Sequence, residues 1–248
     1  MPGTVTAFAD SPDRGRGLAR DFRVRWTLEE LGETCDVRPV AFAELKTPDY
    51  RALQPFGQIP AWQEDGLVLF ESGAIVLHLA QQHPGLLPDD RAGRARSVAW
   101  VFAALDTVEP PIWDWDLARM VERHQPWHAA RQPMLEARIH TRLGQLADWL
   151  GSRDWLEGTF SLGDLMMVSV LRRLQGSGLL EDHPALAGYV RRGEERPAFR
   201  RAFRAQKAVF DGTDPEKGPT GGEPLPKAKG TISSPFRPVP AGAMPWAG

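Results

Sequence analysis

The chain has 248 residues, enough for one large or two modest domains, and a formal net charge of −2 from 30 basic and 32 acidic residues. This balance argues against nucleic acid or an anionic membrane as a partner. No apolar run approaches the roughly 20 residues of a membrane-spanning helix, and the first residues do not resemble a signal peptide. The single cysteine, Cys35, excludes an internal disulfide framework, so we expect a cytoplasmic protein.

The first third of the sequence predicts alternating strands and helices. Residues 4–8 have the composition of a strand, and an Arg- and Gly-rich loop separates them from an amphipathic helix over 21–31. Gly32 ends this helix as a C-cap, and a second strand follows over 35–40. A short helical turn begins at Thr47.

Two short strands and an apolar helix come next. Residues 61–63 and 67–70 flank Asp65 and Gly66, a turn signal because glycine adopts positive φ without steric cost. Ser72 precedes the apolar helix and suits its N-cap position. The complete order, β-α-β-α-β-β-α, indicates a thioredoxin-like unit.

This unit contains features that suit a small anionic peptide. A proline peptide bond has a trans preference of only about 0.5–1 kcal/mol, so Ile59–Pro60 is a candidate for the cis form. A cis bond would turn the backbone N–H and C=O of Ile59 outward, where a peptide could pair with them. The helix end at Ser72 would attract a carboxylate. Each feature alone has a structural explanation, a loop or a cap, but their order together favours a binding site.

The rest of the chain predicts helices until its last part. Residues 83–90 form a linker by their Pro and Gly content, and an all-helical region follows over 91–210. The Pro110–Pro111 pair must break or kink one of its helices. Ser161 and Asp164 form a capping box before another apolar run.

Residues 211–248 differ in composition, because Pro and Gly fill 15 of these 38 positions. We expect an unstructured tail. The alternative is that the tail folds back over a site through Phe236 or Trp246.

The combination resembles the soluble glutathione S-transferase (GST) superfamily, whose fold joins an α/β thioredoxin-like domain to an all-α C-terminal domain. The resemblance covers about residues 4–205, and these motifs carry it: 25–32, 58–60, 71–72, 161–164, 183–186 and 196–199. It implies the domains 1–82, a thioredoxin-like glutathione-binding domain, and 91–210, an all-helical domain, with the linker 83–90 between them and the tail 211–248 beyond.

The resemblance also implies a glutathione site. The backbone of Ile59 would pair with the cysteinyl unit, with Pro60 in the cis form. Glu71 and Ser72 would hold the γ-glutamyl end, and Gln58 would reach the glycine carboxylate.

Two further residues are implied with an alternative for each. Lys46 would approach the glycine carboxylate, or is a solvated surface lysine. Asp106 would reach the glutathione amine of the neighbouring subunit in a homodimer, or is an exposed helical residue.

The catalytic position departs from the family pattern, which places Tyr, Ser or Cys after the first strand. The loop 10–20 contains neither Tyr nor Cys, and Ser11 is its only hydroxyl. Because a nearby cation stabilises a thiolate, we expect Arg20, aided by the helix N-terminus and by Ser11, to activate the glutathione thiol. Cys35 lies beyond the helix, and we expect it to be an inert buried thiol.

A pocket for the electrophile is expected between the domains. Trp113 and Trp115 are candidates to line it with Phe102, with Trp100 behind them, although core packing explains each of them equally well. No metal is expected, because the histidines form no ligand cluster.

Three functions compete. The first is a glutathione transferase that attacks a small apolar electrophile with the thiolate of its co-substrate. The second is a non-catalytic GST-like module that binds a ligand or a protein, favoured by the missing Tyr, Ser or Cys at the usual place. The third, a disulfide reductase, is opposed by the absence of a Cys-x-x-Cys motif.

Overall fold

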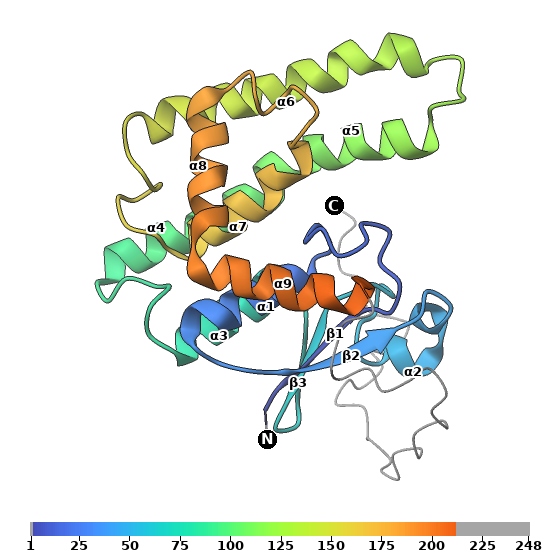
Figure 1. Ribbon diagram of the computed structural model, residues 1–248, viewed down its shortest axis with the longest axis vertical. Helices are drawn as coiled ribbons and strands as arrows, with labels where there is room; N and C mark the ends of the chain where they lie inside the picture. The colour runs from blue at the N-terminus through green and yellow to red at the C-terminus, as the bar shows by residue number, and fades with distance from the viewer. Residues whose placement is uncertain (1, 212–248) are drawn as a thin grey trace, which may run out of the picture. The chain divides into compact units, whose positions relative to one another are not determined.

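A four-stranded sheet forms the N-terminal part of the protein (Figure 1). The computed structural model describes residues 2–211, apart from the side chains of 209–211. The strands are β1 (Thr4–Phe8), β2 (Asp36–Val40), β3 (Ala61–Glu64) and β4 (Leu67–Phe70), in the spatial order β2-β1-β3-β4. β2 is parallel to β1, whereas β3 is antiparallel to both β1 and β4, which is a thioredoxin-like arrangement. The predicted α/β fold of this region is confirmed.

The two faces of the sheet pack against separate apolar clusters. Side chains of a strand alternate between its faces, so Val5 of β1 enters the main core while Phe8 packs against the smaller cluster. The smaller cluster contains Ile59 and Tyr50, which come from the segment between β2 and β3. Packing of this segment on the sheet therefore fixes the backbone that precedes Pro60.

Four helical segments accompany the sheet. They are α1 (Asp21–Leu31), the 3-10 turn η1 (Glu44–Lys46), α2 (Pro48–Arg51) and α3 (Ser72–Gln82). The predicted bounds of α1 are confirmed, and its C-cap Gly32 has the left-handed φ of 75° that favours glycine. The predicted turn at Thr47 is the N-cap of α2, where the threonine side chain accepts a hydrogen bond from the Tyr50 amide.

The prediction that Ser72 caps α3 is wrong by one residue. Glu71 occupies the N-cap with a φ of 69°, and Ser72 is the first helical residue. The chain makes its sharp turn out of β4 at Glu71, so the Ser72 hydroxyl takes no part in capping and is available for other partners. Serine remains a favourable cap in general, but here the turn decides the position.

From Arg91 to Asp211, the end of the described residues, the regular structure is helical, as predicted. Its helices are α4 (Arg91–Phe102), the π-helix η2 (Ala103–Val108), α5 (Glu109–Val121), α6 (His128–Leu150), α7 (Leu162–Leu171), the 3-10 turn η3 (Arg172–Leu174), α8 (Pro184–Glu195) and α9 (Pro197–Asp211). Pro110 and Pro111 lie in the first turn of α5, and because neither can donate an N–H, the preceding turn widens into η2. The Ser161–Asp164 capping box is present at α7.

The helical region packs directly on α1. α9 runs alongside α1, and α5 and α6 form a long helical hairpin (Figure 1). Arg196 donates to both carboxylate oxygens of Glu30 in α1, at 2.6 and 2.7 Å. Phe199 of α9 meets Phe22 of α1 edge-on at 5.2 Å between ring centroids. These contacts attach α1, and with it the start of the candidate site, to the helices.

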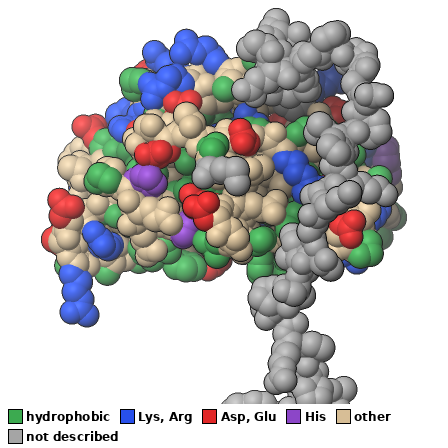
Figure 2. Space-filling model, turned by 90° about the horizontal axis from the view of Figure 1, so that it is seen from below, with side chains coloured by type: hydrophobic (Ala, Val, Ile, Leu, Met, Phe, Trp, Pro, Cys, Tyr) green, Lys and Arg blue, Asp and Glu red, His purple; other side chains and the backbone are tan. Residues whose placement is uncertain are grey.

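None of the helices within residues 2–211 combines the length and the apolar composition of a membrane span. Figure 2 shows one face of the molecule, on which acidic, basic and hydrophobic side chains are interspersed. The predicted tail, with Phe236 and Trp246, lies outside the described residues except for Asp211, the last residue of α9.

Candidate functional site

The loop that ends at Pro60 is held by hydrogen bonds from two side chains. The Ile59–Pro60 peptide bond is cis, as the sequence suggested. The Tyr50 hydroxyl donates to the carbonyl of Gln58 at 2.8 Å, and the Gln54 side-chain oxygen accepts from the Gln58 amide at 3.2 Å. Burial raises the pKa of Tyr50, so the hydroxyl stays protonated and keeps donating. Tyr50 and Gln54 therefore hold this loop from beneath.

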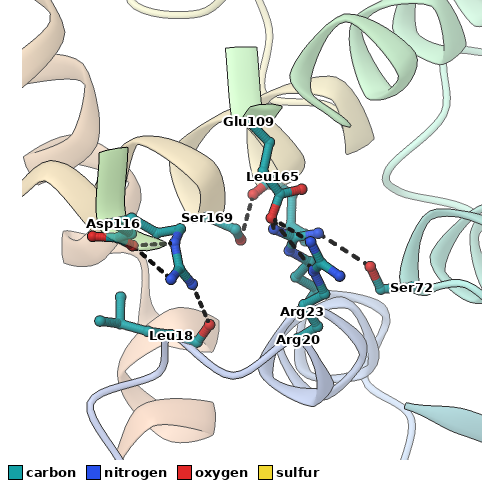
Figure 3. Close-up of polar contacts among 9 residues, drawn as sticks. Leu18, Arg20, Arg23, Ser72, Glu109, Asp116, Leu165 and Ser169 are labelled. Atoms are coloured by element: carbon teal, nitrogen blue, oxygen red, sulfur yellow. Dashed lines mark hydrogen bonds and ion pairs between the residues drawn. The ribbon is translucent and has the colours of Figure 1, made fainter. Parts of the chain in front are cut away.

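A buried ion pair lies beside the start of α3 (Figure 3). Arg23 of α1 donates to the Ser72 hydroxyl oxygen at 3.1 Å and to Glu109 of α5 at 2.8 Å. The side chains of Arg23 and Glu109 are only 4% and 5% exposed. Because Ser72 accepts from Arg23 through its oxygen, its own O–H is left to donate to another group.

Arg20 shares the same carboxylate. It is the N-cap residue of α1, its side chain is 37% exposed, and its Nη2 lies 3.2 Å from Glu109 Oε1. Burial would raise the pKa of Glu109, but the guanidinium groups of Arg23 and Arg20 outweigh it and hold that pKa below its usual value. Two cations thus share one carboxylate, and this cluster carries one net positive charge at the N-terminus of α1.

The loop before α1 folds around one aspartate. Asp13 accepts hydrogen bonds from the amides of Leu18 and Ala19, at 2.6 and 3.1 Å, and from that of Gly15 at 3.1 Å. Ser11 is buried and donates its hydroxyl proton to Asp13 at 2.6 Å. The structure therefore brings Arg20 to the cluster but engages Ser11 within its own loop.

Two consecutive arginines of η3 connect this loop to the helical region. Arg172 donates to the carbonyls of Gly17 and Arg16, at 2.8 and 2.9 Å. Arg173 donates to the carbonyl of Leu18 at 3.3 Å and binds Asp116 of α5 at 2.6 Å. Three successive carbonyls of the loop therefore have partners in η3.

The predicted electrophile residues have different surroundings. Trp113 is 40% exposed, and the guanidinium groups of Arg20 and Arg173 lie 5.6 and 4.9 Å from its ring. Trp115 is 4% exposed and packs in the core, with its indole N–H 3.5 Å from Glu136. Trp113 is therefore the tryptophan of this pair that lies against the Arg20 cluster and reaches solvent.

The other predicted residues lie further out. Phe102 is 54% exposed at the end of α4, while Glu71 and Lys46 are exposed near the starts of α3 and α2. Asp106 is exposed on η2, where it lines an open pocket of about 290 Å³ together with residues that include Thr107, Arg138, Thr141 and Arg142.

Cys35 is half-buried beside the main core. Burial raises the pKa of its thiol to about 11, which makes it a poor nucleophile at neutral pH. This environment agrees with the expectation of an inert thiol.

Several site residues were missed from the sequence. Arg23 and Glu109 lie 86 positions apart, and no local pattern signals their contact. Asp13 carried a detectable signal, because aspartate in a Gly-rich loop commonly accepts nearby amide hydrogen bonds. Arg173 carried none, since its partners come from an early loop and from α5.

Known proteins resemble this chain in sequence and in fold. Residues 14–81 match the family model described as "Glutathione S-transferase, N-terminal domain". A glutathione S-transferase-like protein of Fusarium sp, LUC7, is 35% identical over 131 residues, which are 51% of this chain and 59% of that protein. Glutathione S-transferase F13 of Arabidopsis thaliana is 28% identical over 71% of this chain and 87% of that protein. The match with gedE of Aspergillus terreus spans 42% of that relative.

Solved structures share the fold. Poplar glutathione transferase F1 superposes with a TM-score of 0.72 at 23% identity, covering 84% of this chain and 99% of that one. A glutathione transferase of Burkholderia graminis, described with two glutathione molecules bound per subunit, gives 0.70 at 25% identity, covering 82% and 88%. The chain thus has the fold of the soluble glutathione S-transferases, and residues 14–81 carry the N-terminal domain of that family.

Proposed function

We propose that this protein is a glutathione transferase that activates the thiolate of glutathione for attack on a small apolar electrophile. One observation carries the proposal. At the N-terminus of α1, Arg20 and Arg23 share one buried carboxylate, that of Glu109, which leaves a positive charge beside the hydroxyl of Ser72. This charge suits a ligand that brings one negative charge to the end of α1.

Glutathione is the ligand that this chemistry fits. In the proposal, the backbone of Ile59 beside cis-Pro60 pairs with the cysteinyl unit, and Ser72 donates its free O–H to the γ-glutamyl carboxylate. Glu71 holds the amine of that end, and Gln58 lies toward the glycine carboxylate. The bound glutathione described for relatives from Burkholderia graminis and Pseudomonas fluorescens supports this choice.

Arg20 would supply the activation. A free thiol has a pKa of about 8.5, so only a few per cent is ionised at neutral pH, and a nearby cation increases that fraction. The thiolate sulfur would form a bond to an electrophilic carbon, whose leaving group departs with the bonding electrons, while the thiol proton passes to solvent. Ser11 is the weaker candidate, because its proton is already donated to Asp13.

The proposed second substrate lies against Trp113, whose exposed ring offers an apolar surface beside Arg20. Trp115 and Phe102 belong to the same proposal, with Trp115 supporting the pocket from the core. Such conjugation serves detoxification. The proposal includes a cytoplasmic location and a homodimer. In the dimer, Asp106 reaches the amine of the glutathione bound to the neighbouring subunit, whereas Lys46 approaches the glycine carboxylate of the glutathione in its own subunit.

A non-catalytic GST-like binding module is the second candidate. The engagement of Ser11 by Asp13, in a loop that contains neither Tyr nor Cys, favours it. Such a module would bind a ligand or a protein, and any glutathione that it binds would keep its thiol proton.

A titration of the protein with glutathione, followed by thiolate absorbance at about 240 nm from about pH 5 to about pH 9, separates these candidates. We expect the bound thiol to have a pKa at least one unit below that of free glutathione, and conjugation of 1-chloro-2,4-dinitrobenzene to follow the same pKa. Binding without ionisation would favour the module. Absence of glutathione binding would contradict the transferase and leave a module that binds another ligand or a protein.

A further inference from the structure

In the loop that leads to Arg20, both the backbone carbonyls and the backbone amides are hydrogen-bonded to side chains. Its carbonyls at positions 16, 17 and 18 accept from Arg172 and Arg173 of η3, while its amides at positions 18 and 19 donate to Asp13. The carbonyl oxygens are therefore directed toward the helical region. This orientation determines how the chain enters α1.

Arg173 is connected to Arg20 in two independent ways. It donates to the carbonyl of Leu18, two residues before Arg20, and its guanidinium lies 4.9 Å from the ring of Trp113, which Arg20 also contacts at 5.6 Å. Asp116 fixes Arg173 through two hydrogen bonds, of 2.9 and 2.6 Å. Arg173 is 13% exposed, and its own charge is balanced by Asp116.

We propose that Arg173 is a positioning residue for thiolate activation: it holds the loop and Trp113 so that Arg20 faces the glutathione sulfur. This inference rests on the proposed function. Arg173 acts through Arg20 and Trp113, so its removal would change the ionisation of the bound thiol more than the binding of glutathione, whose γ-glutamyl contact at Ser72 belongs to another part of the site.

The test compares Arg173→Gln with Arg192→Gln. Arg192 is a matched control, because it also binds a carboxylate and a backbone carbonyl, both of Asp154, and lies 5.9 Å from the ring of Trp155, with no contact to the loop. Circular dichroism verifies that each variant is folded. The rate of amide hydrogen exchange at Leu18 and Ala19 measures how firmly the loop is held.

Arg173→Gln is expected to raise the pKa of bound glutathione by about one unit, a tenfold loss of thiolate below that pKa. The value of kcat/KM would fall about tenfold near pH 6.5 and recover above about pH 9, with the dissociation constant of glutathione changed less than about threefold. Exchange at Leu18 and Ala19 would be faster. Arg173→Lys would restore part of the loss, and Arg192→Gln would behave as the wild type.

The inference is overturned if folded Arg173→Gln keeps the wild-type thiol pKa, if its rate loss is independent of pH, or if Arg192→Gln causes an equal shift. If Arg173→Gln does not fold, Asp116→Asn replaces it in the test, because this variant removes only the charge that holds Arg173. It must raise the pKa of bound glutathione by less than the roughly one unit expected for Arg173→Gln. A wild-type protein that binds no thiolate would instead contradict the proposed function.

Discussion

Replacement of Glu109 by glutamine tests the buried cluster between α1 and α5. Arg23 is 4% exposed and has its closest ion-pair contact, 2.8 Å, with this carboxylate. Removal of one partner from a buried pair costs about 3–5 kcal/mol, because the remaining charge stays buried. Glutamine retains one acceptor oxygen, so we expect Glu109→Gln to lower the free energy of unfolding by about 3 kcal/mol, at the lower end of that range.

Urea unfolding at neutral pH and fixed protein concentration measures this loss. Arg96→Met is the control, since Arg96 pairs with Glu157 at the surface with its side chain 56% exposed, and such pairs contribute less than about 1 kcal/mol. The double variant Arg23→Met/Glu109→Leu should regain most of the stability, because an apolar pair leaves no buried charge. A Glu109→Gln loss no larger than that of Arg96→Met would refute the reasoning.

The pH dependence of this loss has a defined sign. The pKa of Glu109 is depressed in the folded state relative to about 4.3 in an unfolded chain, so its contribution is complete above that value and disappears as the pH falls through the folded pKa. The difference in stability between wild type and Glu109→Gln should therefore be full at pH 7 and shrink below about pH 4.

Three further outcomes are expected. Ser72→Ala should weaken glutathione binding about tenfold in calorimetry, the loss of one hydrogen bond to a charged group, and should also lower the melting temperature, because the buried Arg23 guanidinium loses an acceptor. Gly163→Ala should destabilise the protein by about 1–3 kcal/mol in urea unfolding, because the new Cβ would lie 2.5 Å from the Trp100 Cβ; an unchanged midpoint would contradict this packing. Asp164→Ala should lower the free energy of unfolding in urea by more than about 2 kcal/mol, since it removes the acceptor of the Tyr189 hydroxyl and of two backbone amides. Tyr189→Phe should lower it by less, because Asp164 keeps both amide partners.

Local patterns predicted much of the fold. The apolar period over 21–31 and the glycine that follows gave the bounds of α1, because helix ends depend on nearby residues. The Ser161–Asp164 capping box was predicted for the same reason. Ser72 was placed one residue too early relative to α3, since the turn at Glu71 depends on how β4 meets the helix and not on cap preference alone.

The candidate site was less predictable. The motifs at Pro60 and Ser72 are local, so the sequence shows them, and Arg20 was predicted from its position before α1; the roles of these residues stay predictions. The pairing of Arg23 with Glu109 joins segments that meet only in the folded chain, as does the contact of Arg173 with Leu18. Long-range contacts of this kind have no periodic signal, so the charge balance around Arg20 could be determined only from the structure.

The most direct test of the account is the pKa of glutathione bound to Arg20→Met, measured by thiolate absorbance beside the wild type and the Arg192→Gln control. Arg20 is the more exposed of the two cations in the cluster, so its loss should raise the pKa of the bound thiol by about one unit or more. Arg192→Gln should leave that pKa unchanged. A folded Arg20→Met protein that binds glutathione with the wild-type thiol pKa would contradict the claim that this arginine activates the thiolate.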